Sequence, residues 1–149
     1  MTNSDKTDAR PGRLSLWFQR RSNTRTVARV RAGKGRSMGM DLLVLTTTGR
    51  RTGRRHDTPL SWFAEGEAWL VVASGGGAGS PQWLRNLVAD PDGAAVELPG
   101  QGPRPVRSEV LDGPERERAW ARIVAAQPRY AKYQGRSERV YPVVRLTAR

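Results

Sequence analysis

The chain has 149 residues, of which 37% are hydrophobic, and its mean hydropathy is −0.64. This length suits a single domain with a modest core. The absence of cysteine excludes disulfides and cysteine-based metal sites and favours the cytoplasm. A net charge of +12 attracts nucleic acid, anionic lipid or an anionic ligand, and charge alone does not choose among them.

The positive charge is concentrated at the start of the chain. Residues 1–36 hold ten Lys or Arg and two Asp, a net charge of +8. Residues 1–12 are polar and end in Pro-Gly, which predicts disorder. An apolar stripe over 14–32 predicts a helix that ends at Gly33. We therefore expect a basic N-terminal arm at 1–36 and a folded domain at 37–149.

The arm also carries an apolar cluster formed by Leu14, Trp17 and Phe18. Aromatic and aliphatic side chains beside many cations suit an anionic membrane surface, so the arm is expected to bind such a surface reversibly. The alternative is an arm that folds onto the rest of the chain and buries Trp17 and Phe18 itself. No signal peptide is recognised in the first twenty residues, and the longest apolar run, 68–73, is too short to cross a membrane.

Six segments have the composition of β-strands and lie close together along the chain. The Glu-Gly-Glu turn at 65–67 predicts a hairpin between the second and third. Pro59 cannot donate a ladder hydrogen bond, so we expect it at a strand start or a sheet edge. The predicted strands are 42–48, 58–64, 68–74, 94–98, 105–111 and 140–146.

Two helices are predicted between these strands. One begins at Ser80-Pro81, with Ser80 as the N-cap, and runs to about residue 89. The other opens at Asp-Gly-Pro 112–114 and ends before Pro128. A doubly wound parallel sheet would need a helix between nearly every pair of strands. The pattern instead favours an antiparallel sheet curled into a small barrel.

The most informative segment is a basic glycine turn, Gly-Arg-Arg-Thr-Gly-Arg-Arg at 49–55. Gly49 and Gly53 can adopt backbone angles closed to other residues, so neighbouring N–H groups can converge on one point. The surrounding arginines make the turn suited to a phosphate or a polyanionic tail. The alternative is a solvated basic hairpin. It is not a P-loop, since no Gly-Lys-Ser/Thr follows, and the GxGxxG fingerprint is absent.

Two further candidate sites follow in the chain. The glycine segment 75–79 comes after Ser74 and leads into a predicted helix, so a ligand could lie against its backbone and the helix N-terminus. The alternative is a flexible linker. Tyr130 and Tyr133 lie three residues apart, so they share one face of a turn or helix and could flank an aromatic ligand or donate a proton. The alternative is ordinary surface packing.

The sequence does not indicate a metal or hydrolytic site. His56 is the only histidine, and without cysteine it does not suggest a transition-metal centre. The pair His56-Asp57 lacks a positioned nucleophile and is not a triad. Trp62, Trp69 and Trp120 are expected in the core.

Taken together, these segments resemble the deazaflavin (coenzyme F420)-dependent nitroreductase family. The resemblance covers about two thirds of the chain, from 42 to 144, and its most specific part is Leu-Thr-Thr-Thr-Gly-Arg-Arg-Thr-Gly at 45–53. It implies an α+β fold, a small split β-barrel that is mostly antiparallel, with two inserted helices and the basic N-terminal helical arm. The other matching segments are Thr-Pro-Leu 58–60, Val-Ala-Ser 72–74, Gly76-Gly77, Trp83, Asn86-Leu87, Asp90-Pro91, and Tyr130 with Tyr133.

The resemblance also implies residue roles. The basic turn would hold the coenzyme's phosphate, with Arg51 at the family's basic position, and the segment after the third strand would lie along the deazaflavin ring. The implied cofactor-binding residues are Arg50, Arg51, Thr52, Gly53, Arg55, His56, Thr58, Pro59, Val72, Ala73, Ser74, Gly75, Gly76, Gly77, Trp83 and Asn86, and the implied catalytic residues are Tyr130, Tyr133 and Ser74. His56 stands where members usually carry arginine, and Gly75 where lysine is frequent.

The function implied by the resemblance is an F420-dependent oxidoreductase. It would transfer hydride from the reduced deazaflavin to a quinone, a nitroaromatic compound or an activated enone, in the cytoplasm or at the inner membrane face. One alternative is the same barrel with FMN, and another is a carrier that binds the deazaflavin without turnover. A basic nucleic-acid-binding module is disfavoured, because the arginines are not interleaved with exposed aromatic residues and no nucleic-acid motif is present.

Overall fold

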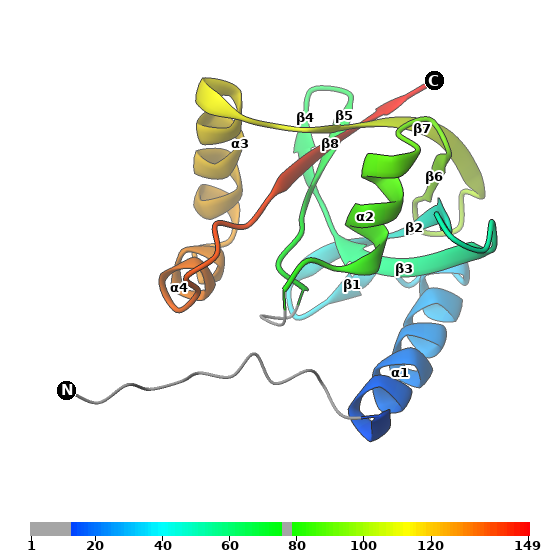
Figure 1. Ribbon diagram of the computed structural model, residues 1–149. Helices are drawn as coiled ribbons and strands as arrows, with labels where there is room; N and C mark the ends of the chain where they lie inside the picture. The colour runs from blue at the N-terminus through cyan, green and yellow to red at the C-terminus, as the bar shows by residue number, and fades with distance from the viewer. Residues whose placement is uncertain (1–12, 76–78) are drawn as a thin grey trace.

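The structure is a computed structural model that describes residues 13–75 and 79–149, with side-chain surroundings from Ser22 onward. Within these ranges the chain forms one curled sheet and four helices (Figure 1). The elements are α1 (Arg13–Arg31), β1 (Arg36–Ser37), β2 (Met40–Thr48), β3 (Arg55–Ser61), β4 (Phe63–Glu65), β5 (Ala68–Val72), α2 (Gln82–Ala89), β6 (Ala94–Glu97), β7 (Pro103–Val110), α3 (Gly113–Ala126), α4 (Arg129–Gly135) and β8 (Val143–Ala148).

The sheet is antiparallel at every pairing and closes on itself through one stretch of chain. Its order is β1-β2-β6-β7-β8-β5-β4, and β3 pairs with β2 outside this path. β3 and β4 are separated only by Trp62. Residues 55–65 therefore pair with β2 at one end of the sheet and with β5 at the other. This curl confirms the predicted α+β fold with a small, mostly antiparallel split barrel.

β5 shows how both faces of the sheet are buried. Trp69, Val71 and Ala73 point into an interior cluster that α2 completes. Leu70 and Val72 belong to a second cluster on the opposite face, under α3 and α4. Because successive strand residues face opposite sides, a strand covered on both faces is a continuous apolar run. The same reasoning accounts for the run of apolar residues in β2.

The second half of α1 packs against the barrel. Val27 and Val30 form a small buried cluster with Leu42 and Val44 of β2. This part of the basic arm therefore belongs to the folded structure. The side chains of Leu14, Trp17 and Phe18, and all of residues 1–12, lie outside the described residues. None of the described helices is both long enough and apolar enough to cross a membrane.

Arg31, at the end of α1, is held by two carboxylates of the sheet. Its guanidinium donates to Glu97 Oε2 at 2.8 Å and to Asp57 Oδ2 at 2.9 Å. Burial raises the pKa of the Asp57 carboxyl, but hydrogen bonds from Thr46, Arg31 and Arg55 outweigh that effect and hold the pKa below its ordinary value. The ionised form of Asp57 is therefore the one that stabilises the folded chain.

All six predicted strands are present with changed bounds, and the two-residue strand β1 was not predicted. The predicted strand 58–64 is broken at Trp62, because its two halves pair with different edges of the sheet, and it starts earlier, at Arg55. Among the described strands β3 pairs with β2 alone, so Pro59 lies at a sheet edge, one of the two positions expected for it. The last strand begins at Val143 rather than at residue 140.

The helix predictions hold for α1, α2 and α3, but one cap was wrong. α2 begins at Gln82 with Pro81 in the N-cap position and no side-chain cap, so Ser80 does not cap it. A third inserted helix, α4, forms in the polar segment that carries the tyrosines. It is too short for a hydrophobic period to reveal it.

Asp57→Asn should remove an acid-sensitive part of the stability. A carboxyl whose pKa is lower in the folded state stabilises fully above its unfolded-state pKa, and this contribution is lost as the pH falls through the folded-state pKa. We expect the variant to be about 1–2 kcal/mol less stable at pH 7, as for the loss of charge-assisted hydrogen bonds. Its urea unfolding should also change less between pH 6 and pH 3 than that of the wild type. Asp92→Asn is the control, since that carboxylate is exposed and 3.8 Å from Arg107. Parallel pH curves for wild type and Asp57→Asn would contradict this role.

Candidate functional site

The basic turn between β2 and β3 is tightly hydrogen-bonded. The Gly49 N–H donates to the Arg54 carbonyl at 2.7 Å, and the Gly53 N–H donates to the Gly49 carbonyl at 2.8 Å. Gly53 has φ 69°, in the left-handed region as predicted. Gly49 does not have such an angle, so that expectation was wrong for it, and its lack of a side chain matters instead, since a Cβ there would lie 2.9 Å from both His56 Nε2 and Thr52 Oγ1. One glycine therefore supplies the backbone angle and the other supplies room.

Arg50 is fixed against α2 by neutral groups. Its guanidinium donates to Gln82 Oε1 at 2.8 Å and to Asn86 Oδ1 at 3.1 Å, and its backbone N–H also donates to Asn86 Oδ1. The Asn86 side chain is 4% exposed and donates in turn to Thr47 Oγ1 at 3.1 Å. Because both acceptors are amides, the position of Arg50 is fixed while its charge is not neutralised.

The other arginines of the turn fall into two groups. Arg55 pairs with Asp57 at 3.3 Å and belongs to the structural network around Arg31. Arg51 and Arg54 are exposed, and within the described ranges neither guanidinium makes a hydrogen bond or an ion pair. The turn therefore presents three cations without a carboxylate partner among the described residues, which is the donor set that an anionic group requires.

Residues Thr58 and Pro59 continue the same strand. Both are half-buried, and they pair in register with Leu45 and Val44 of β2. The predicted pocket floor thus follows the basic turn directly along β3. Whether these side chains contact a ligand stays a prediction.

Both ends of the glycine segment are described. Gly75 follows β5 with φ 62°, a conformation that favours glycine. Gly79 precedes α2, and Gly76 and Gly77 lie outside the described residues. The Arg139 guanidinium donates to the carbonyl groups at both ends of the segment, those of Ser74 at 2.9 Å and Gly79 at 3.1 Å. Sequence analysis missed Arg139, because nothing distinguishes it from the other arginines of the chain.

The residues predicted to lie along the coenzyme ring face different sides of the sheet. Ala73 and Trp83 are buried in the interior cluster with α2. Val72 is buried on the opposite face, in the cluster that includes Tyr130. The Val72 and Ala73 side chains therefore do not form one continuous wall. Any contact between residues 72–74 and the coenzyme ring would therefore be made by their backbone and by the Ser74 side chain.

The two tyrosines of α4 differ in exposure. The Tyr130 ring is 9% exposed and packs edge-on against Phe63 at 5.6 Å and Tyr133 at 5.8 Å between ring centres. Burial raises the pKa of the Tyr130 hydroxyl, and a hydrogen bond with Ser61 offsets part of that effect. Tyr133 is 40% exposed. Tyr130 thus packs inside the fold and Tyr133 is the more exposed of the two, and the catalytic roles expected for both stay predictions.

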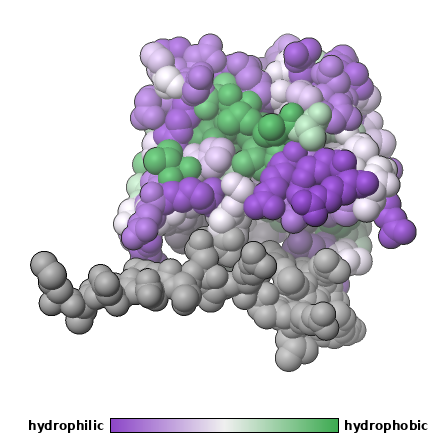
Figure 2. All heavy atoms as spheres, viewed as in Figure 1, coloured by the Kyte–Doolittle hydropathy of each residue, from purple (hydrophilic) through white to green (hydrophobic). Residues whose placement is uncertain are grey.

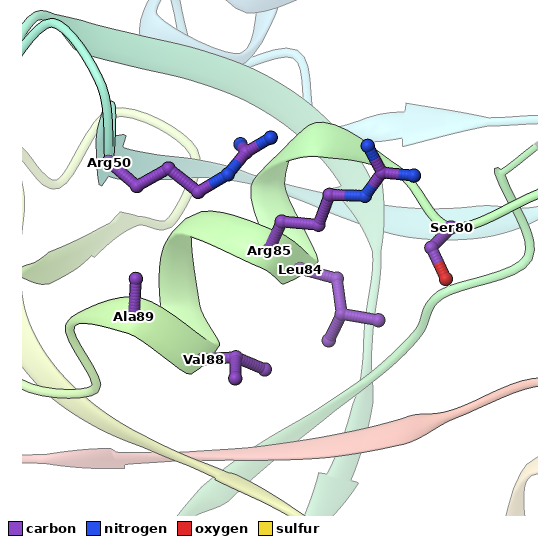
Figure 3. A pocket seen from close by; sticks show the side chains of 6 residues that line it. All are labelled: Arg50, Ser80, Leu84, Arg85, Val88 and Ala89. Atoms are coloured by element: carbon purple, nitrogen blue, oxygen red, sulfur yellow. The ribbon is translucent and has the colours of Figure 1, made fainter.

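An open hollow of about 420 Å³ lies beside Arg50 on the outer side of α2. In Figure 3 the guanidinium groups of Arg50 and Arg85 extend along the helix toward its Ser80 end. Figure 2 shows an apolar surface between α3 and α2, bordered by hydrophilic residues. Cationic Arg50 and Arg85 therefore line the same hollow as apolar side chains of α2. The residues that line the hollow are Arg50, Ser80, Leu84, Arg85, Val88 and Ala89.

These features fit an anionic coenzyme better than a metal. The free cations of Arg51 and Arg54 match a phosphate or carboxylate tail. Among the described residues no group of three or more His, Cys, Asp or Glu side chains could hold a metal ion. The fold and the site define a small split-barrel protein with a preformed cationic site at the β2–β3 turn.

Comparisons with known proteins assign the family. The sequence profile described as F420H(2)-dependent quinone reductase matches residues 16–148. The chain is 36% identical over 121 residues to the putative F420H(2)-dependent quinone reductase Rv3178 of Mycobacterium tuberculosis H37Rv, covering 80% of this chain and 100% of that protein. It is 39% identical over 116 residues to the F420H(2)-dependent quinone reductase Rv1261c of the same strain, covering 72% of this chain and 73% of that protein.

A solved structure agrees with this assignment. The F420-H2 dependent reductase FDR-A superposes with a TM-score of 0.63 at 33% identity, covering 71% of this chain and 93% of that chain. The chain therefore belongs to the F420H(2)-dependent quinone reductase family. Membership confirms the predicted F420-dependent family and the predicted reductase activity. It gives no support to the FMN alternative or to a nucleic-acid-binding module.

Asn86→Ala should weaken the attachment of the basic turn to α2. The substitution removes the acceptor of Arg50 and leaves Thr47, which is 1% exposed, without its donor. We expect a loss of about 1–3 kcal/mol in the free energy of unfolding, the range for a buried polar group left unpaired. The control is Gln82→Ala, which removes an exposed acceptor of the same guanidinium. Equal losses for both variants in urea unfolding would contradict the central position of Asn86.

Proposed function

We propose that the basic turn and the glycine segment of this chain hold F420H2, and that the enzyme reduces a quinone-type acceptor beside Tyr133. The observation that carries the proposal is the set of arginines without carboxylate partners among the described residues, Arg50, Arg51 and Arg54. Other arginines of the fold, such as Arg31 and Arg145, are paired with carboxylates. What distinguishes the turn is that three such arginines lie within five consecutive residues, 50–54, so that together they could bind one anionic group.

The arrangement suggests which part of the coenzyme each of the two segments binds. Its phosphate and glutamate tail match the cations of the turn, and its planar ring matches the segment 75–79, in which four of the five residues are glycine. α2 joins the two segments, because Gly79 leads into it and its Gln82 and Asn86 bind Arg50. A ligand that contacts both segments would thus lie along α2.

The protein's own share of the reaction is positioning and proton supply. When bound, reduced F420 supplies a hydride, which requires no protein nucleophile or metal. Holding donor and acceptor face to face accounts for much of the rate enhancement. Reduction of a quinone also consumes a proton at an acceptor oxygen. The exposed Tyr133 hydroxyl and the Ser74 hydroxyl are the groups we assign to orienting that oxygen and supplying the proton, and buried Tyr130 holds the Tyr133 ring in place.

The direct test is retention of coenzyme after desalting. The purified chain is mixed separately with F420, FMN and FAD, desalted, and measured by absorbance. We expect F420 to be retained, and FMN and FAD to be lost. Retention of FMN equal to or stronger than that of F420 would reject the proposed cofactor. Quinone reduction by the F420H2-loaded protein then tests the acceptor class, with nitroaromatic and enone acceptors in parallel.

Arg51→Ala should weaken F420 binding by about 1.5–3 kcal/mol, the range for a hydrogen bond to a charged group. This corresponds to roughly a tenfold to a hundredfold rise in Kd. Binding should also weaken as salt is added, because exposed charges are screened. Arg122→Ala removes the same charge from an exposed position on α3 and serves as the control. An unchanged Kd for Arg51→Ala in a fluorescence titration would place the anion elsewhere.

Tyr133→Phe should lower kcat and leave the Kd for F420 nearly unchanged. The substitution keeps the ring that packs against Tyr130 and removes only the exposed hydroxyl. Loss of one general acid typically costs about 10²-fold or more in rate. Tyr130→Phe is the companion variant, and it should lower stability more than kcat, because its hydroxyl is buried. Weaker F420 binding with intact acceptor kinetics would contradict this assignment.

We also propose that the basic arm binds anionic membrane surfaces reversibly from the cytoplasmic side. The support is its +8 charge together with Leu14, Trp17 and Phe18. Each cation near an anionic leaflet contributes about 1 kcal/mol. The full-length chain should pellet with phosphatidylserine vesicles, whereas Arg20→Ala/Arg21→Ala should pellet less. Equal pelleting of both proteins, or none by either, would reject the proposal.

A further inference from the structure

Arg139 connects two parts of the site that the chain keeps far apart in sequence. Its guanidinium donates to the carbonyl groups of Ala73 at 3.3 Å, Ser74 at 2.9 Å and Gly79 at 3.1 Å. These carbonyl groups stand where β5 has ended and before α2 begins. A side chain 65 positions from Ser74 and 60 positions from Gly79 therefore ties the two ends of the glycine segment together. Gly75 is also close, since a Cβ there would lie 3.7 Å from the Arg139 Nη2.

The backbone of Arg139 is fixed in turn by α4 and the residues that follow it. Gln134 Nε2 and Ser137 Oγ both donate to the Arg139 carbonyl, at 2.9 and 3.0 Å. The Arg139 guanidinium lies over the ring of Tyr141 at 5.4 Å. The Tyr141 hydroxyl donates to the Tyr133 carbonyl at 3.1 Å. A continuous series of contacts thus runs from Tyr133 to the glycine segment.

The chemistry of these contacts requires an arginine. A guanidinium carries five N–H donors in a planar fork, so it can serve several carbonyl groups at once, which a single amide cannot do. Among the described residues Arg139 pairs with no carboxylate, and its side chain is half-buried. Carbonyl groups beyond the end of a strand need other hydrogen-bond donors when they are buried. Arg139 therefore supplies the hydrogen bonds that regular secondary structure does not.

We propose that Arg139 is a positioning residue for the reduction, which helps set the distance between Ser74 and Gly79, at the described ends of the glycine segment, and the helix that carries Tyr133. This inference rests on the proposed function, in which the glycine segment meets the coenzyme ring and Tyr133 meets the acceptor. Among the described residues, no hydrogen bond or ring contact joins either tyrosine of α4 directly to that segment. Arg139 and Tyr141 provide a side-chain link between them, beside the shared packing of Tyr130 and Val72 and the hydrogen bond from the Ala73 N–H to the Pro142 carbonyl.

The test compares Arg139→Met, Arg139→Lys and Arg136→Met. Arg139→Met keeps the length of the side chain and removes all its donors. Arg139→Lys keeps the charge and a single donor group. Arg136→Met is the matched control, since Arg136 lies in the same connection and is exposed. For each protein we measure the midpoint of urea unfolding, the Kd for F420 by fluorescence titration, and kcat for a quinone at saturating F420H2.

We expect Arg139→Met to raise the Kd for F420 and to lower kcat, each by roughly tenfold, because a misplaced binding surface impairs both steps. Arg139→Lys should recover much of both losses, and Arg136→Met should match the wild type. A merely structural role would lower the unfolding midpoint of Arg139→Met without changing the kinetics of the folded protein. If Arg139→Met does not fold, an intermediate Kd and kcat for Arg139→Lys support the proposal.

Two results overturn the inference. One is a folded Arg139→Met, or failing that Arg139→Lys, with the Kd and kcat of the wild type. The other is an Arg139→Lys that is no better than a folded Arg139→Met. These results differ from failure of the proposed function, which is seen in the wild type itself. A wild-type protein that does not bind F420 overturns the proposed function and this inference with it.

Discussion

The closure of the sheet by a single run of chain, residues 55–65, is the constraint on which the site depends. The run starts beside β2 and ends beside β5, with Trp62 at the change of partner. Its first residues complete the cationic turn, and Phe63, near its end, packs against Tyr130. The cationic turn and the tyrosine helix are therefore attached to opposite ends of one short segment. A rigid closure of the barrel fixes both relative to the same sheet.

A chain with a net charge of +12 must arrange its arginines so that repulsion does not oppose folding. In the structure, Arg31 and Arg145 each join two elements and form ion pairs with carboxylates. Arg31 joins α1 to the sheet through Glu97, and Arg145 joins β8 to β4 through Glu65 at 2.6 Å. Arg50 and Arg139 are instead held by uncharged oxygens, so they are ordered and keep their full charge. Positive potential is thereby retained where an anion is expected to bind.

The sequence predicted the parts of this structure that depend on local pattern. Apolar runs identified the strands, and Gly53 beside four arginines identified the turn. It did not reveal contacts that only the folded chain brings together. Arg139 acquires its role from carbonyl groups of β5 and of Gly79, which no spacing in the sequence records. The break at Trp62 was missed for a related reason, because 58–64 is a continuous strand-like run and only the sheet order requires it to divide.

Pro59 has a consequence for the behaviour of the protein in concentrated solution. β3 has β2 as its one strand partner in the described sheet, so its other side resembles an exposed strand edge. Such edges can recruit a strand from another molecule and start aggregation. A proline in the middle of β3 withholds one main-chain donor, and Arg55 and His56 place polar side chains at the start of the same strand. The strand that shapes the site therefore also discourages edge-to-edge association between copies of the chain.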